Sequence, residues 1–169
     1  MLKFLVNNKE VNTDLPAGSS LVDFLRNEMH LYGTKIGCRE GDCGACTVLV
    51  GELVNGKMDY KAMTSCLTPM GNAVGKHIVT IEGINQAKLT EIQSEFVEQS
   101  GTQCGFCTPG FILSLYGFCL GDKPFSMENA IEAVAGNICR CTGYKSIERS
   151  IAPIVQKLQS LDRSNPLKW

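Results

Sequence analysis

Four cysteines in the first half of the chain have a spacing that can hold an inorganic cluster. Cys38, Cys43 and Cys46 lie within nine residues, and Cys66 follows twenty residues after them. The spacing C-x4-C-x2-C, followed by a more distant cysteine, is typical of a plant-type [2Fe–2S] cluster bound by four thiolates. Nearby glycines leave the backbone room to wrap around such a cluster. A structural zinc site or a chance set of buried thiols is the alternative, although zinc favours separate close pairs of cysteines.

Four more cysteines form two close pairs in the second half. The pair Cys104-x2-Cys107 is common to zinc sites and redox dithiols, so alone it does not identify the metal. The pair Cys139-x-Cys141 is unusual for zinc, because one intervening residue cannot form a normal zinc knuckle. Both pairs lie at junctions of predicted helices, where the positive ends of helix dipoles would stabilise an anionic cluster. These residues favour iron–sulfur and leave zinc open.

The ninth cysteine, Cys119, matches neither pattern. It shares a predicted helix face with apolar residues, which indicates a buried apolar thiol. His30 and His77 are interpreted as surface or strand residues, because the two thiolate sets are already complete.

Composition excludes several classes of protein. Sixteen Lys and Arg against seventeen Asp and Glu give a formal charge of −1, so there is no basic excess to attract nucleic acid or anionic lipid. The first ten residues hold too short an apolar stretch for a signal peptide, and no run reaches the ~18 apolar residues of a membrane span. We therefore expect a cytoplasmic protein, in which clustered cysteines are more often metal ligands than disulfides.

Residues 1–84 have the pattern of a small mixed sheet with one helix across it. The dipeptides Asn7-Asn8 and Asn55-Gly56 predict two hairpin turns. Ser20 is the predicted N-cap of a helix that follows it, with Asp23 at the third helical position. Strands are expected over four stretches: 3–6, 11–15, 47–50 and 77–81.

Helical periodicity replaces this pattern in residues 85–162, so we place a domain boundary after residue 84 and interpret 163–169 as a tail. Helices are predicted over 90–100, 109–120, 126–135 and 146–161. Thr90 and Gln93 form a capping box, Pro109 is a first helical residue, Ser126 is an N-cap, and Pro153 is expected to kink the last helix. Four short helices with brief connections predict a bundle.

Three stretches together resemble the cluster signatures of the molybdenum hydroxylases, the xanthine oxidase family. Residues 34–48 (TKIGCREGDCGACTV) are similar to the first-cluster signature, and residues 103–110 (QCGFCTPG) and 136–144 (GNICRCTGY) to the second-cluster signatures. The resemblance implies an α+β chain, with an N-terminal ferredoxin-like β-grasp domain followed by a C-terminal four-helix bundle. It also implies that eight cysteines ligate two [2Fe–2S] clusters: Cys38, Cys43, Cys46, Cys66, Cys104, Cys107, Cys139 and Cys141.

An electron-transfer function follows from the same resemblance. Electrons would pass from molybdopterin through the second cluster and then the first cluster to FAD, with no catalytic residue on this chain. Gln103 and Cys141 would lie against the pterin. Because 169 residues already hold two cluster domains, we expect molybdopterin and FAD on partners: a molybdopterin-binding large subunit and an FAD-binding subunit or domain. The chain would be a separate subunit or the front of a longer polypeptide.

Details of the chain resemble xanthine dehydrogenases within the family. The residues before Cys43, the hairpin through 55–62 and the stretch 110–115 are more similar to purine-oxidising members than to carbon monoxide or nicotinate enzymes. One alternative is the iron–sulfur subunit of another member that oxidises aldehydes, carbon monoxide, nicotinate or an aromatic-CoA. Others are a free-standing ferredoxin-type carrier, which leaves the second half unexplained, and a zinc-stabilised interaction module.

Overall fold

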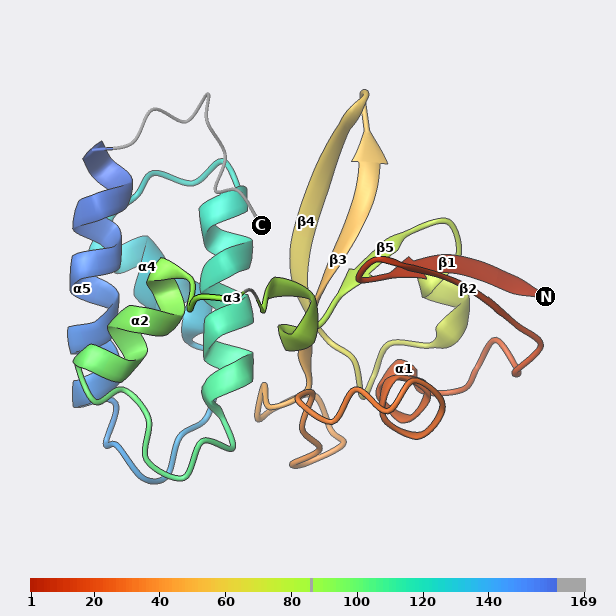
Figure 1. Cartoon of the computed structure of the whole chain (residues 1–169), viewed down its shortest axis with the longest axis horizontal. Helices are drawn as coiled ribbons and strands as arrows, with labels where there is room; N and C mark the ends of the chain where they lie inside the picture. The colour runs from red at the N-terminus through yellow and green to blue at the C-terminus, as the bar shows by residue number, and fades with distance from the viewer. Residues whose placement is uncertain (86, 161–169) are drawn as a thin grey trace.

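A computed structural model describes residues 1–85 and 87–160, and Figure 1 shows a sheet-containing half beside a helical half. One mixed sheet has the strand order β2-β1-β5-β3-β4. Its strands are β1 (Leu2–Val6), β2 (Lys9–Thr13), β3 (Thr47–Val54), β4 (Lys57–Thr64) and β5 (His77–Val79). β1 pairs with β5 in parallel, and the other neighbouring strands pair antiparallel. Both predicted hairpin turns lie in this sheet, as do the strand stretches predicted over 3–6 and 47–50. The strand predicted over 11–15 lies instead at Lys9–Thr13, and the one predicted over 77–81 ends at Val79, because Ile81 begins a 3-10 helix.

A short helix packs against the sheet and provides the core of the first half. It consists of α1 (Leu21–Asp23) and a π-helical segment over Phe24–Glu28. Ser20 is the N-cap residue of α1 and Asp23 its third residue, as predicted, but the Ser20 hydroxyl makes no capping hydrogen bond and instead donates to the carbonyls of Ser65 and Cys66, at 3.4 and 3.1 Å. This contact ties the start of the helix to the turn that carries Cys66. The core residues come from the helix, from β1, β2, β3 and β5, and from the 3-10 turn Met70–Ala73: Phe4, Val6, Val11, Leu21, Phe24, Leu25, Val48, Val50, Met70, Ala73 and Ile78.

Four helices form the second half: α2 (Glu91–Glu98), α3 (Thr108–Leu120), α4 (Met127–Val134) and α5 (Lys145–Ser160). The Thr90–Gln93 capping box is present, and Ser126 caps α4. Pro109 is the second rather than the first residue of α3, and α5 continues past Pro153. The predicted helix end at residue 161 and the predicted tail lie outside the described residues. Within the described part of the chain, no helix has the length and apolar character needed to cross a membrane.

Helix α3 joins the two halves. Side chains alternate along a strand, so Val48 and Val50 face the α1 core while Leu49 faces the opposite side and joins the helical core. Gly117 of α3 allows the close approach, because a Cβ at this position would lie 3.3 Å from Leu49 Cδ2 and 3.4 Å from Ala62 Cβ. The helical core therefore extends onto the sheet, and the sheet holds α3 in place.

Replacing Gly117 with leucine should lower the free energy of unfolding by about 1–3 kcal/mol, the usual cost of overpacking a tight interface. The added side chain has to displace α3 from Leu49 and Ala62. Gly136→Ala is the matched control, because a Cβ there meets nothing within 4 Å, and it should change stability by less than about 0.5 kcal/mol. Denaturant unfolding of the cluster-loaded protein measures both, and equal values for the two variants would contradict this account of the interface.

Candidate metal centres

The β3–β4 hairpin brings two of the predicted ligands together. Cys46 directly precedes β3, Cys66 follows β4 by two residues, and Thr47 pairs with Thr64 at that end of the ladder. Ser65 closes the gap, since its amide and hydroxyl both donate to the Cys46 carbonyl, at 3.2 and 2.6 Å. Burial raises the pKa of Cys46 to about 11, and the adjacent Cys66 thiol adds to the rise. Strand register therefore positions this pair.

The loop before β3 carries the other two cysteines of the first set, Cys38 and Cys43. The Glu40 amide donates to the Cys38 sulfur at 3.3 Å, and the amides of Glu40 and Cys43 lower the pKa of Cys38 to about 7. Gly37 lets the loop close, because a Cβ there would lie 2.7 Å from the Cys43 sulfur. The loop thus directs N–H donors at sulfur, which favours the anionic thiolate form that binds metal.

An ion pair fastens this loop to α1. Arg39 has a φ of +61° and donates two hydrogen bonds to the two carboxylate oxygens of Asp23, at 2.8 and 2.7 Å. The hydrogen bond from Arg39 lowers the pKa of Asp23. Arg39 is exposed and Asp23 partly exposed, so solvent screens the pair and it adds little to stability. Its geometric effect is to hold the loop against the helix.

Helix junctions bring the second set together. Cys104 and Cys107 lie between α2 and α3, and Cys139 and Cys141 lie between α4 and α5. The sulfurs of Cys104 and Cys141 are 3.6 Å apart, and the thiols of Cys107 and Cys139 form the other pair. Burial, followed by the neighbouring thiols, raises the pKa of Cys107 to about 12. Burial also acts to raise the pKa of Cys139, but hydrogen bonds from the Thr142 hydroxyl and amide, at 3.1 and 3.5 Å, outweigh it and the pKa is lowered.

The residues present fit the predicted clusters. Each set supplies four thiols in two adjacent pairs, and a [2Fe–2S] cluster takes two thiolates on each of its two irons. Among residues 1–85 and 87–160, no three Cys, His, Asp or Glu side chains are arranged to hold one metal ion. The two-and-two arrangement matches a binuclear cluster better than the four-thiol tetrahedron that a structural zinc ion requires.

The two sets lie next to each other. A cavity of about 330 Å³ is lined by Cys43 of the first set and by all four cysteines of the second set. Beside it, the Ile138 amide donates to the Cys43 carbonyl at 2.9 Å. A backbone hydrogen bond therefore joins a cysteine of the first set to the residue that precedes Cys139.

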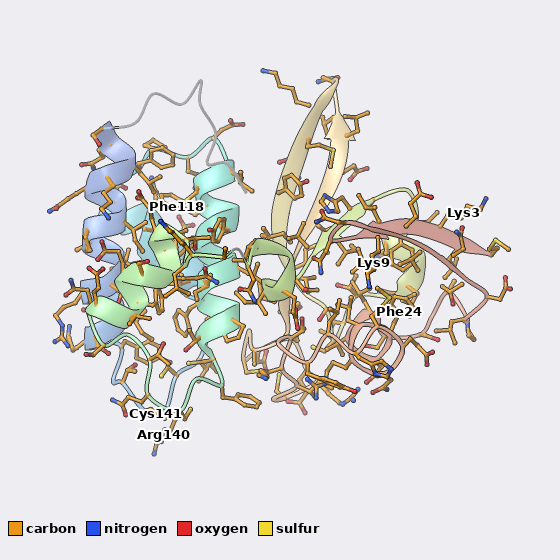
Figure 2. The ribbon with its side chains drawn as sticks, viewed as in Figure 1. Lys3, Lys9, Phe24, Phe118, Arg140 and Cys141 are labelled. Atoms are coloured by element: carbon orange, nitrogen blue, oxygen red, sulfur yellow. The ribbon has the colours of Figure 1, made fainter. Side chains whose placement is uncertain are left out.

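The second set is exposed at its outer end. Cys104 and Cys141 are exposed, whereas Cys139 is buried. Figure 2 shows Arg140 and Cys141 at one end of the helical half, in the loop between α4 and α5. Gln103 is exposed beside Cys104, so both residues predicted to contact the pterin are accessible from outside this chain.

Three polar residues that hydrogen-bond to the cysteines were not identified from the sequence: Ser65, Thr142 and Tyr144. The Tyr144 hydroxyl accepts a hydrogen bond from the Cys139 amide at 3.1 Å. Thr142 and Tyr144 lie within five residues of Cys139, and this closeness in the sequence could have indicated that they contact it. Nothing in the pattern around Ser65 indicated that its hydroxyl reaches the Cys46 carbonyl.

The two histidines are a surface residue and a strand residue, as predicted, and their rings form hydrogen bonds with groups other than the thiols. His30 Nδ1 lies 2.9 Å from the Tyr32 hydroxyl. In β5, the ring nitrogens of His77 lie 2.7 Å from the Tyr60 hydroxyl and 2.9 Å from the Asn7 carbonyl. Both rings therefore take part in hydrogen bonds that involve no cysteine.

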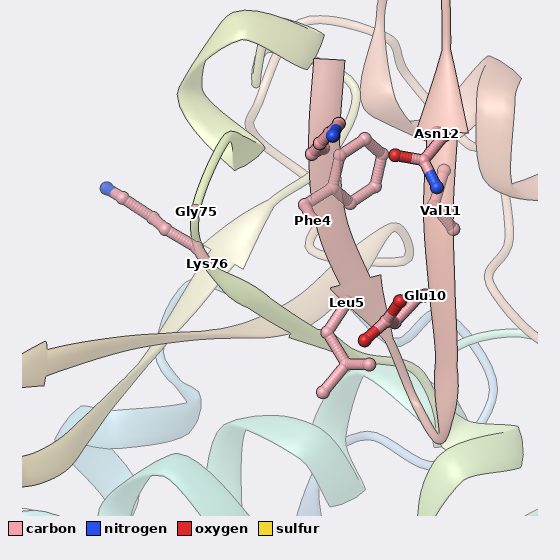
Figure 3. Close-up of a pocket in the computed structure, with 8 residues that line it drawn as sticks. Phe4, Leu5, Glu10, Val11, Asn12, Gly75 and Lys76 are labelled. Atoms are coloured by element: carbon pink, nitrogen blue, oxygen red, sulfur yellow. The ribbon is translucent and has the colours of Figure 1, made fainter. Parts of the chain in front are cut away.

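A separate groove lies on the β1–β2 hairpin (Figure 3). Its volume is about 450 Å³, and it has no cysteine in its lining. The lining residues come from β1, β2 and the segment leading to β5: Lys3, Phe4, Leu5, Glu10, Val11, Asn12, Gly75 and Lys76. This groove is not part of the cysteine sites.

Comparison with known proteins agrees with the geometry. Residues 4–71 match a family described as a 2Fe-2S iron-sulfur cluster binding domain, and residues 80–152 match a [2Fe-2S] binding domain family. The first range contains the first cysteine set, and the second range contains the second set. A chain in the crystal structure of quinoline 2-oxidoreductase from Pseudomonas putida 86 is 34% identical, with a TM-score of 0.80 and 94% of each chain covered. The chain belongs to the molybdenum hydroxylase family, as its iron–sulfur part.

Longer relatives contain the same region. The chain is 40% identical over 152 residues to xanthine dehydrogenase of Drosophila subobscura, covering 87% of this chain and 11% of that protein. It is 39% identical over 155 residues to aldehyde oxidase 2 of Cavia porcellus, covering 89% of this chain and 12% of that protein. The chain thus spans about a ninth of the length of these molybdenum hydroxylases. Their similarity supports an electron-transfer iron–sulfur domain with an α+β, ferredoxin-like fold.

Cys119 lies outside both sets, on α3. Its side chain packs beside the helical core, and burial raises the pKa of its thiol to about 12. This agrees with the interpretation of an apolar thiol.

Cys119 should therefore resist alkylation at pH 8 in the folded molybdenum hydroxylase chain. A raised pKa keeps the reactive thiolate scarce until the pH approaches 12, whereas an unfolded cysteine with a pKa near ~8.5 is substantially ionised at pH 8. Mass spectrometry of the peptide containing Cys119, with and without denaturant, measures the difference. Rapid labelling of the native chain would contradict the burial described here.

Proposed function

We propose that this chain conducts electrons, one at a time, between a molybdopterin site and FAD held on partner chains or domains of a molybdenum hydroxylase. The observation that supports this most strongly is that two four-cysteine sets lie in a single folded chain, with Cys43 of the first set and all four cysteines of the second set lining one cavity. A bound [2Fe–2S] cluster supplies one-electron redox chemistry, which the protein tunes through burial and hydrogen bonds to sulfur. The chain itself supplies no catalytic residue.

The eight cysteines of the two sets are the proposed ligands. Cys38, Cys43, Cys46 and Cys66 would hold one cluster, and Cys104, Cys107, Cys139 and Cys141 the other. We propose the units 1–84 and 85–162 as the corresponding domains, although the helical core also takes in Leu49 and Val79 from the sheet. A free-standing ferredoxin would need only the first unit, and the packing of α3 on β3 speaks against a dispensable second unit.

The exposed end of the second set is the proposed contact with molybdopterin. Gln103 and Cys141 are accessible there, and the nearby apolar side chains of Phe106 and Ile138 are also exposed. Exposed apolar groups around a site indicate a surface that a partner covers. The first set would then deliver electrons to FAD.

The proposed enzyme is similar to xanthine dehydrogenase and acts in the cytoplasm. The residues that resemble purine-oxidising members support xanthine, and aldehyde oxidation is the alternative, since an aldehyde oxidase is about equally similar. Mass spectrometry of the chains that purify with this protein distinguishes the two.

Purified without exposure to air, the chain should contain about four iron and four acid-labile sulfide, because two complete thiolate sets each hold one [2Fe–2S] cluster. Cys43→Ser should remove about half of each, because it disrupts only the first set. Cys119→Ser is the matched control and should leave both counts unchanged. Stoichiometric zinc without sulfide would contradict the proposal.

The order of transfer can be tested in the assembled complex. With Cys43→Ser, substrate should still reduce the cluster of the second cysteine set but should no longer reduce the flavin. With Cys104→Ser, substrate should reduce neither the remaining cluster nor the flavin. Rapid mixing with xanthine, followed by optical and paramagnetic resonance spectroscopy, measures each centre separately.

Metal binding and folding are coupled, so assembly must be compared first by size and composition of the complexes. Flavin reduction at the normal rate in an intact Cys43→Ser complex would overturn the proposed order.

A further inference from the structure

Asn137 connects the two cysteine loops through buried hydrogen bonds. It lies between α4 and Cys139 and is only 4% exposed. Its side-chain Nδ2 donates to the Gly44 carbonyl at 3.1 Å, and its Oδ1 accepts from the Ser114 hydroxyl of α3 at 2.8 Å. One side chain therefore joins the first cysteine loop, the second cysteine loop and the helix that packs on the sheet.

The backbone packs so closely around Asn137 that neither Gly44 nor Gly110 has room for a side chain. A Cβ at Gly44 would collide with Asn137 Nδ2 and would lie 2.5 Å from the Gly136 carbonyl. A Cβ at Gly110 would collide with the Gly44 carbonyl and lie 2.8 Å from Asn137 Nδ2. Gly44 also has a φ of +67°, a conformation that side chains rarely adopt. The two loops and α3 thus meet with almost no free space.

The residues on either side of this contact are proposed ligands. Gly44 follows Cys43, and Asn137 is two residues before Cys139. The hydrogen bond from the Ile138 amide to the Cys43 carbonyl lies beside the Asn137 contact. Any separation of the two loops at Asn137 would therefore move Cys43 away from Cys139.

We infer that Asn137 is a positioning residue that fixes the separation of the two clusters. This inference rests on the proposed function, because it requires a cluster in each cysteine set. A buried asparagine that merely satisfied its own hydrogen bonds would stabilise the fold without setting this separation. The two roles differ in a measurable quantity: the magnetic dipolar coupling between the reduced clusters, which falls with the cube of their distance.

The test uses Asn137→Asp in the full chain, purified with its associated chains and fully reduced. Aspartate keeps the size of the side chain and an acceptor for Ser114, but it places a carboxylate oxygen against the Gly44 carbonyl in place of the donor. The repulsion should open the junction. Low-temperature paramagnetic resonance should show a smaller and broader splitting between the two cluster signals, with iron and sulfide contents unchanged.

Two further variants complete the test. Ser114→Ala removes one hydrogen bond to Asn137 and should reduce the splitting less than Asn137→Asp does, and it serves as the test if Asn137→Asp fails to fold. Ser126→Ala is the matched control, since it also removes one hydrogen bond from the helical half, at the start of α4. Its splitting should equal that of the unaltered protein.

The outcomes separate the inference from the proposed function. If the unaltered protein lacks two [2Fe–2S] signals, the proposed function fails. If both signals are present but the splitting is unchanged in Asn137→Asp, or in Ser114→Ala where that variant is the one that folds, the positioning role is overturned. A splitting that falls equally in Ser126→Ala would also overturn it, because the effect would then follow general loss of stability.

Discussion

Convergence of four thiols from distant parts of the sequence is the constraint on which both halves of this chain depend. In the first half, the ladder between β3 and β4 brings Cys46 beside Cys66, and a tight loop returns Cys38 and Cys43 to them. In the second half, Cys104 and Cys141, which lie 37 residues apart along the chain, meet between helices. Each cysteine site needs strands or helices on both sides, because flexible loops alone would not hold these distant segments next to each other.

Electrostatics adds a second requirement, because a thiolate-bound cluster is anionic. The donors that meet the sulfurs in this chain are neutral: the Glu40 amide at Cys38, and the amide and hydroxyl of Thr142 at Cys139. Cys107 is the N-cap residue of α3, so the positive end of that helix dipole points at the second set. Because the two sets use different donors and differ in burial, their proposed clusters should have different reduction potentials.

The sequence predicted the elements and the cysteine sets well, because periodicity, caps and ligand spacing are local signals. Hairpin turns at Asn7 and Asn55, the capping box at Thr90 and the cap at Ser126 all lie where they were predicted. Ser20 also lies at its predicted N-cap position, but its hydroxyl donates to the Ser65 carbonyl, 45 residues away, and does not cap the helix. Contacts between residues far apart in the sequence, such as that of Asn137 with Gly44 across 93 residues, cannot be predicted from the local sequence pattern.

The boundary predicted after residue 84 does not divide the hydrophobic core, because contacts between distant residues are not visible in local composition. Composition changes sharply there, yet Leu49 and Val79 pack with the helices, and Gly117 lets α3 lie against the sheet. Two metal sites on independently moving domains would have a variable separation, and electron transfer is sensitive to distance. A shared core and a crowded junction at Gly44 and Gly110 restrict that motion. The packing between the halves is therefore part of the proposed electron-transfer function as much as the ligands themselves.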